Sequence, residues 1–141
     1  MLKALVPVDG SENALRAVRH LIALVQGREP MEVFLLNVQE PIDAWEVRRC
    51  YKPEEIEAMQ ISSGGDALRS AEQLLREAGV AFAPEVRIGD AAQTIANFAR
   101  EQRCDKIIMG TRGMSSLANL LMGSIATKVI HLTDVPVTLV K

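Results

Sequence analysis

The chain has 141 residues, of which 48% are apolar, 24% charged and 4% aromatic, and its formal net charge is −2. This length predicts one domain, residues 1–141, because a domain usually holds about 100–200 residues. The ordinary apolar fraction excludes disorder, the apolar runs are too short to span a membrane, and the lack of surplus positive charge excludes broad binding to nucleic acid or anionic membranes.

Two further features concern the cellular compartment. The first residues lack the pattern of a signal peptide. Cys50 and Cys104 have neither the spacing of metal ligands nor that of a CxxC redox motif. We therefore expect two reduced thiols in a soluble, cytoplasmic protein.

Apolar residues alternate along the chain between strand-like runs and helical stripes. Residues 2–8 predict a strand. Residues 11–26 predict a helix, with Ser11 as its N-cap and Gly27 just past its end. A second apolar run over 31–38 is too short for a helix and predicts the next strand.

The middle of the chain is less regular. A polar loop is expected over 39–52, and Pro53 is typical of the first position of a helix. This helix should end at Gly79. A kink or mobile turn is expected at 62–65, because each glycine within a helix costs about 1 kcal/mol relative to alanine.

The remainder of the chain continues the alternation. A strand over 82–88 precedes a helix that Asp90 caps, and the next strand is predicted over 105–110. A helix over 117–132 and a strand over 135–140 complete the pattern.

This order predicts an α/β fold, an open doubly wound parallel sheet of five strands with helices on both faces. Pro84 and Pro136 lack the N–H group that a ladder needs, so the third and fifth strands belong at the edges. The resulting strand order is 3-2-1-4-5. Ligands of such sheets bind beyond the carboxyl ends of the strands at the switch point, here between strands one and four.

Glycines with a defined spacing follow the fourth strand. Residues 110–124 read G-x2-G-x9-G-S. Glycine permits positive φ values and close approach of a ligand, and a nearby helix N-terminus favours phosphate. Ser124 adds a hydroxyl donor and Arg112 a cation. At the switch point this spacing indicates a phosphate site rather than a plain surface turn.

Three motifs together resemble the universal stress protein family, and the resemblance covers the whole chain. They are Pro7-Val8-Asp9-Gly10-Ser11 after strand one, Asn37-Val38 at the end of strand two, and the glycine segment 110–124. In that family this glycine spacing marks the branch that binds ATP. The resemblance therefore implies ATP, or AMP or ADP, as the ligand, with Mg²⁺ carried on the phosphates.

The family resemblance also assigns roles to single residues. Asp9 matches the aspartate against the adenosine, Pro7 and Val38 border the adenine slot, and Gly110 matches the ribose contact. The phosphate cradle corresponds to Arg112, Gly113, Gly123, Ser124 and Ile125. The implied set of site residues is completed by Val8 and Met109.

The same resemblance implies a homodimer that pairs through the strand 135–140, and an uncovered apolar edge there favours such pairing. The favoured function is a regulator or sensor that reports nucleotide state to an unknown protein partner. Two alternatives stay open. One is a dimerising stress protein whose pocket does not function, and the other is a slow ATPase, for which no acidic residue beyond Asp9 obviously joins the site.

Overall fold

The computed structural model describes residues 1–111 and 123–141. Its strands pair in parallel in one sheet of order β3-β2-β1-β4-β5, which confirms the predicted strand order. The strands are β1 (Leu2–Pro7), β2 (Met31–Gln39), β3 (Phe82–Ile88), β4 (Lys106–Gly110) and β5 (Val137–Val140). The described helices are α1 (Glu12–Gln26), α2 (Trp45–Cys50), α3 (Pro53–Glu77), α4 (Ala91–Glu101) and α5 (Ser124–Leu132).

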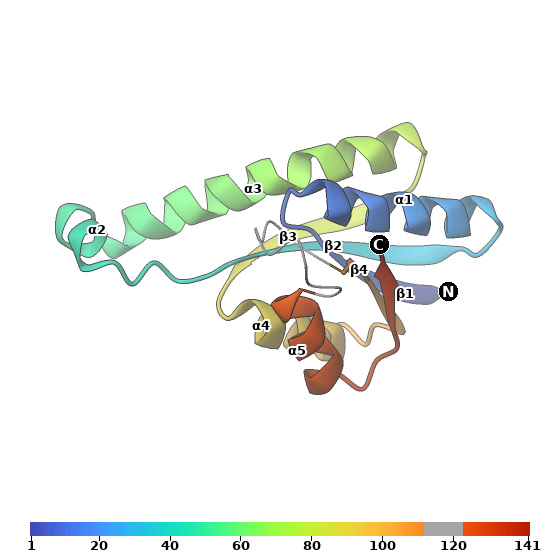
Figure 1. Cartoon of the computed structure of the whole chain (residues 1–141). Helices are drawn as coiled ribbons and strands as arrows, with labels where there is room; N and C mark the ends of the chain where they lie inside the picture. The colour runs from blue at the N-terminus through green and yellow to red at the C-terminus, as the bar shows by residue number, and fades with distance from the viewer. Residues whose placement is uncertain (112–122) are drawn as a thin grey trace.

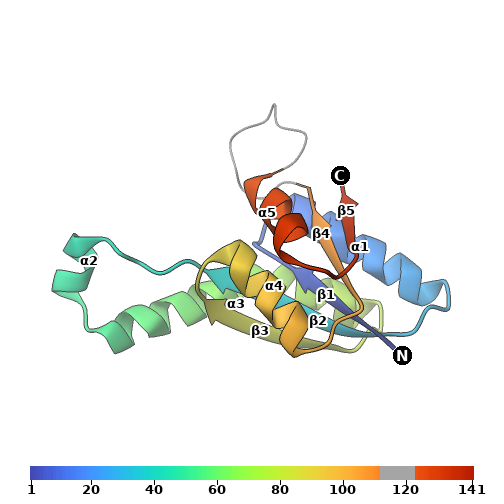
Figure 2. The ribbon, with the colours of Figure 1, turned by 90° about the horizontal axis from the view of Figure 1, so that it is seen from below.

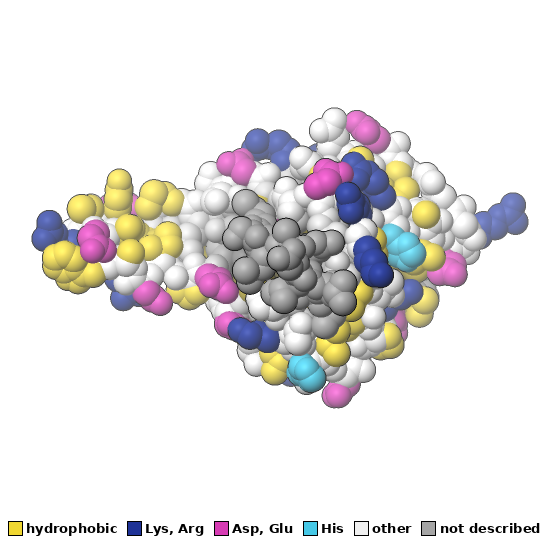
Figure 3. Space-filling model, viewed as in Figure 1, with side chains coloured by type: hydrophobic (Ala, Val, Ile, Leu, Met, Phe, Trp, Pro, Cys, Tyr) yellow, Lys and Arg dark blue, Asp and Glu magenta, His cyan; other side chains and the backbone are white. Residues whose placement is uncertain are grey.

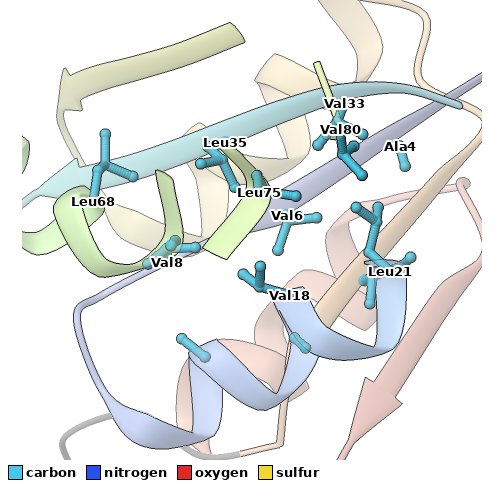
Figure 4. Packing of buried hydrophobic residues seen from close by; sticks show 14 of the residues in the cluster. Ala4, Val6, Val8, Val18, Leu21, Val33, Leu35, Leu68, Leu75 and Val80 are labelled. Atoms are coloured by element: carbon cyan, nitrogen blue, oxygen red, sulfur yellow. The ribbon is translucent and has the colours of Figure 1, made fainter. Parts of the chain in front are cut away.

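Helices cover both faces of the sheet (Figures 1 and 2). Helices α1 and α3 pack on one face, and α4 and α5 pack on the other. Successive side chains of a strand point to opposite faces, so Val6 joins the first layer and Leu5 the second. Figure 4 shows the first layer, where Val18 of α1 and Leu75 of α3 meet the strands. Each such fully buried side chain contributes roughly 1.5–3 kcal/mol of transfer free energy.

Side-chain caps fix where two helices begin. Ser11 Oγ accepts a hydrogen bond from the Ala14 N–H at 3.2 Å, and Asp90 Oδ2 accepts one from the Gln93 N–H at 3.0 Å. Both predicted N-caps are confirmed. Because β1 and β3 run parallel, the starts of α1 and α4 lie at the same edge of the sheet, where the carboxyl ends of the strands meet.

The polar loop expected over 39–52 is interrupted by a helix, so that prediction was wrong in part. Helix α2 has six residues, and none of them is buried. It therefore shows no apolar stripe from which a helix can be predicted. Glu46 in its first turn and Arg48 and Arg49 in its last turn match the helix dipole, the local feature that favours it.

The kink expected at 62–65 is absent, because α3 is one helix of 25 residues. Gly64 is buried against β2 and β3: a Cβ on it would lie 2.9 Å from the Asn37 Oδ1 and would collide with the side chain of Val86. The lack of a side chain lets α3 approach the sheet closely, and this packing offsets the conformational cost of glycine.

Helix α5 confirms the described part of the helix predicted over 117–132. Gly123 is the N-cap of α5, and the helix starts at Ser124, so the glycine lies at the helix terminus and not inside it. The 117–122 part of that prediction lies outside the described residues. The strand predicted over 135–140 begins at Val137, a boundary difference of the usual size.

One part of the chain projects from the body of the molecule. Helix α2 and the first half of α3 extend past the sheet in both ribbon views (Figures 1 and 2). We call residues 41–61 the arm. Its base is held by Gln60, which is 5% exposed and donates from Nε2 to the Glu40 C=O at 2.6 Å. Among the helices of the described ranges, none has both the length and the apolarity to cross a membrane.

Candidate functional site

A cavity of about 290 Å³ lies at the carboxyl ends of the central strands. It is bounded by the carboxyl ends of β1, β2 and β4, by the turn after β1, and by the first turns of α1, α4 and α5. This is the switch point of the 3-2-1-4-5 sheet, where the crossovers from β1 and β4 leave in opposite directions. The lining residues are Pro7, Val8, Asp9, Ala14, Leu36, Asn37, Val38, Ala91, Ile95, Met109, Gly110, Thr111, Gly123, Ser124, Ile125 and Ala126.

The turn after β1 places one carboxylate at the cavity. Asp9 Oδ1 accepts a hydrogen bond from the Ser11 N–H at 2.9 Å, which fixes the side chain against the start of α1. Gly10 between them has φ +88°, a conformation that residues with a Cβ rarely adopt. Across the turn, Ala67 of α3 lies 3.5 Å from the position that a Cβ on Gly10 would take. The Asp9 carboxylate is therefore held at the rim but stays exposed to solvent.

The end of β2 exposes backbone groups to the same cavity. Strand β1 ends opposite Leu36, whose C=O accepts from the Val8 N–H at 2.8 Å. In a parallel ladder the backbone groups of alternate residues point the same way, so the Val38 N–H and C=O point to the side that β1 has left. In a continued ladder the Val8 C=O would accept from Val38. Instead it accepts from Asn37 Nδ2 at 2.8 Å.

Asn37 thus takes the place of the next rung of the β1–β2 ladder. It is 3% exposed, and its Oδ1 accepts from Gln39 Nε2 at 2.7 Å. Both ends of its amide are therefore hydrogen-bonded, as a buried amide requires. The arrangement leaves the main chain of Val38 available to a planar ligand that carries one donor and one acceptor.

The end of β4 forms the opposite wall. A Cβ on Gly110 would collide with the side chain of Asn13 in α1, so a larger residue here would displace the Asn13 side chain. Thr111, 5% exposed, follows it and donates its N–H to the Val140 C=O at 3.0 Å. Within the described part of the chain, the buried Thr111 Oγ1 has no hydrogen-bond partner.

Helix α5 directs its N-terminus to the cavity. The Gly123 N–H donates to the Thr111 C=O, and the Gly123 C=O accepts from the Thr127 N–H at 3.1 Å. The N–H groups of Ser124, Ile125 and Ala126 have no partner within the helix, because the first N–H groups of any helix lack one. Together with the helix dipole they provide partial positive charge suited to an anion.

The structure brings most of the predicted site residues together. Those that line the cavity are Pro7, Val8, Asp9, Val38, Met109, Gly110, Gly123, Ser124 and Ile125. Arg112 and Gly113 lie outside the described residues. The lining residues that sequence reasoning missed are Ala14, Leu36, Asn37, Thr111, Ala91, Ile95 and Ala126. Of these, Asn37 and Thr111 belong to the motifs at 37–38 and 110–124, where only their neighbours were predicted as site residues, and Asn37 also interrupts an otherwise apolar strand.

The lining of the cavity combines apolar walls with few polar groups. Its walls are mostly aliphatic, with one carboxylate and several backbone N–H groups as the polar elements. The described ranges contain no group of three or more His, Cys, Asp or Glu side chains that could hold a metal ion. Mg²⁺ is commonly held through phosphate oxygens of a bound molecule together with one or two carboxylates.

These features define a doubly wound α/β protein with a small-molecule cavity at its switch point. The chain belongs to the universal stress protein family, whose model matches residues 1–141. The universal stress protein MJ0531 of Methanocaldococcus jannaschii is 30% identical to it over 146 residues, which cover 99% of this chain and 81% of the relative.

Solved structures show the same fold. The structure of MJ0577, another universal stress protein of M. jannaschii, is 27% identical and has a TM-score of 0.85, covering 99% of this chain and 95% of that chain. More distant structures were solved with nucleotides. One with cAMP is 20% identical, with a TM-score of 0.72, and covers 99% of this chain and 97% of its own. One from Arabidopsis thaliana with AMP is 21% identical, with a TM-score of 0.70, and covers 100% and 92%.

Proposed function

We propose that this protein binds an adenine nucleotide, ATP in particular, in the switch-point cavity and acts as a nucleotide-dependent regulator. The observation that carries the proposal is the pairing of two features across one cavity. The main chain of Val38 is left open on one side by Asn37, and the N-terminus of α5 lies on the other. The first suits the edge of a base and the second suits phosphate.

The apolar part of the cavity fits the base. Leu36, Ile95 and Met109 offer aliphatic surfaces to a flat ring, and the Val38 N–H and C=O can meet an adjacent acceptor and donor on its edge, as adenine presents. The volume of about 290 Å³ lies near the lower end of the roughly 300–1,000 Å³ range of small-molecule pockets. A nucleoside fits within it, and the phosphates extend toward Gly123.

The polar rim fits the rest of the nucleotide. The Asp9 carboxylate has acceptor capacity beyond its bond to the Ser11 N–H, and it suits the hydroxyl groups of a ribose. The first N–H groups of α5 and the Ser124 hydroxyl would hold the phosphates, with Arg112 and Gly113 as further members of the cradle. Mg²⁺, when bound, neutralises phosphate charge and is held by phosphate oxygens.

Two further parts of the proposal concern assembly and location. The protein forms a homodimer through β5, an edge strand whose Val137 and Leu139 are only half-buried. It acts in the cytoplasm, where its free thiols Cys50 and Cys104 stay reduced. A nucleotide-dependent contact with a further protein would then deliver the signal.

Calorimetric titration of the purified protein with ATP tests the central claim. We expect saturable binding of ATP and clearly weaker binding of GTP, whose base presents the opposite pattern at the same edge. Asp9→Ala should weaken ATP binding by about tenfold, equivalent to roughly 1.4 kcal/mol, because it removes a charged acceptor. Asp134→Ala is the matched control, since Asp134 is exposed in the loop before β5, and its affinity should equal that of the wild type.

Mass spectrometry of nucleotide released from the purified protein gives a second readout. Absence of any adenine nucleotide, together with absence of heat on titration with ATP, would contradict the proposed binding. It would favour the alternative of a stress protein that acts by protein contact alone.

A further inference from the structure

The arm carries apolar side chains that the fold leaves uncovered. Trp45 is 64% exposed, Tyr51 46% and Ile61 49%. Figure 3 shows hydrophobic side chains gathered on the projecting end of the molecule. Exposed apolar surface concentrated on one projection marks an interaction site more often than scattered single residues do.

A groove lies beside these side chains. It has a volume of about 510 Å³ and runs between α2, the start of α3 and the end of β3. Ile42, Ile56 and Ile88 give it apolar walls, while Arg48 and Glu57 place one charge of each sign in its lining. The arm therefore presents a projecting aromatic side chain and an apolar groove within a few residues of each other.

Helix α2 is short and has no buried residue. It has six residues, whereas isolated helices shorter than about 12–15 residues are marginal in water. Its internal support is slight: Arg48 pairs with Asp43 at 3.4 Å between exposed side chains, and the Arg49 guanidinium lies 4.9 Å from the centre of the Trp45 ring. Exposed pairs of this kind contribute about 0–1 kcal/mol each.

The distribution of charge points to a second copy of this chain as the partner. The end of α2 and the residue after Tyr51 are basic, through Arg48, Arg49 and Lys52, and the start of α3 is acidic, through Glu54, Glu55 and Glu57. A two-fold axis between two arms sets each basic segment against the acidic segment of the other copy. An isologous contact requires this self-complementarity.

We propose that the arm is a self-association surface, in which Trp45 of each copy enters the groove of the other. The contact is distinct from pairing through β5, which lies well apart from the arm in both ribbon views (Figures 1 and 2). It covers α2, removes two indole rings from water and pairs opposite charges. Because the patch is small, it is a weak contact that forms in about the micromolar range.

The single tryptophan of the chain provides a direct readout. We expect the emission maximum of Trp45 to shift to shorter wavelength as the wild-type protein is concentrated from about 1 to about 500 μM, a range that brackets a micromolar dissociation constant. The mean mass in sedimentation equilibrium should rise over the same range. Added salt should weaken both changes, since it screens exposed charges.

Ile88→Ser removes apolar surface from the groove and keeps Trp45 as the probe, so the shift should disappear. The matched control is Leu132→Ser on α5, which removes a comparably exposed apolar side chain, 47% against 37%, away from the arm; it should retain the shift. An emission maximum that does not depend on wild-type concentration overturns the proposal, whatever the mass. So does a shift that survives Ile88→Ser. If Ile88→Ser fails to fold by circular dichroism, the wild-type titration decides alone.

Discussion

Gly64 and Gly65 are neighbours in sequence, but they occupy different environments in α3. A Cβ on Gly64 would meet the Asn37 Oδ1 at 2.9 Å and collide with Val86, whereas a Cβ on Gly65 would meet nothing within 4 Å. Sequence reasoning treated the two as one helix-breaking pair. Each glycine lowers helix stability through a local conformational effect. At Gly64 this loss is offset by packing against β2 and β3, on residues more than twenty positions away in sequence.

The pair gives an internally controlled prediction. Gly64→Ala should lower the free energy of unfolding by roughly 1–3 kcal/mol, because the added methyl group overpacks the contact between α3 and the sheet. Gly65→Ala should raise it by roughly 0.5–1 kcal/mol, because alanine is the better helix former and has open space. Urea unfolding measures both. Equal effects of the two substitutions would show that the close approach of α3 is not what constrains position 64.

We predict that Asn37 supports ATP binding indirectly, because its side chain occupies the Val8 C=O and so leaves the backbone groups of Val38 open to the ligand. Asn37→Ala removes the donor to the Val8 C=O, so the Val38 N–H can bond to that C=O and close the open edge. We expect ATP affinity to fall by about tenfold, with a loss of roughly 1–2 kcal/mol in stability. Gln73→Ala, which removes an exposed amide on α3, should change neither. Unaltered ATP affinity in Asn37→Ala, measured by calorimetry, would contradict this role.

Cys104 should lower the free energy of unfolding at alkaline pH. Burial raises the pKa of its thiol to about 11 from 9.0. The unfolded chain therefore releases this proton first as pH rises, so the contribution is complete below pH 9 and is lost as pH approaches about 11. Urea unfolding of the wild type and of Cys104→Ala across this window should show a steeper decline in the wild type. Parallel declines would mean that the thiol does not hold its proton in the folded state.

At the scale of elements, the sequence predicts what local rules determine. Pro84 and Pro136 gave the sheet order because each removes a backbone donor, and Ser11 and Asp90 gave two helix starts because each caps its own helix. The arm escaped prediction for the opposite reason. Helix α2 has no buried residue, so its sequence carries no periodic apolar signal from which a helix could be predicted.

The cavity was predictable where it follows from the ends of strands and the spacing of glycines. Asp9, Gly110 and Gly123 come together because parallel strands end at one edge. Asn37 was missed as a lining residue because its role is to replace a backbone hydrogen bond. Such a role depends on which β2 residue lies opposite the end of β1. This register is a property of the two paired strands and cannot be predicted from the sequence of β2 alone.

At the scale of the whole molecule, β5 is an edge strand of the sheet that the described residues form, and we propose that it pairs with a second copy. The Pro136 C=O accepts from the Ile107 N–H of β4, and the Val140 C=O accepts from the Thr111 N–H. By alternation, the backbone groups of Val137 and Leu139 point away from β4. Leu139→Pro removes an outward N–H and leaves the bonds to β4 intact. We expect it to convert the proposed dimer to a monomer.

Light scattering at a concentration below that of arm association measures this change. Thr138→Ala is the control, because the backbone groups of Thr138 face β4; it should remain dimeric. A monomer mass for the wild type, or a dimer mass for a folded Leu139→Pro variant, would exclude pairing through this edge.

The unequal lengths of β1 and β2 affect how the cavity would respond to mutation. If the edge of the base is recognised by the N–H and C=O of Val38, replacing the Val38 side chain leaves both groups in place. An alanine scan would then score Val38 as nearly silent, while replacement of its backbone N–H by an ester oxygen would remove one of the two hydrogen bonds to the base and leave the Val38 C=O in place. The position that selects the base would thus tolerate sequence drift, and relatives could keep one ligand while differing at that residue.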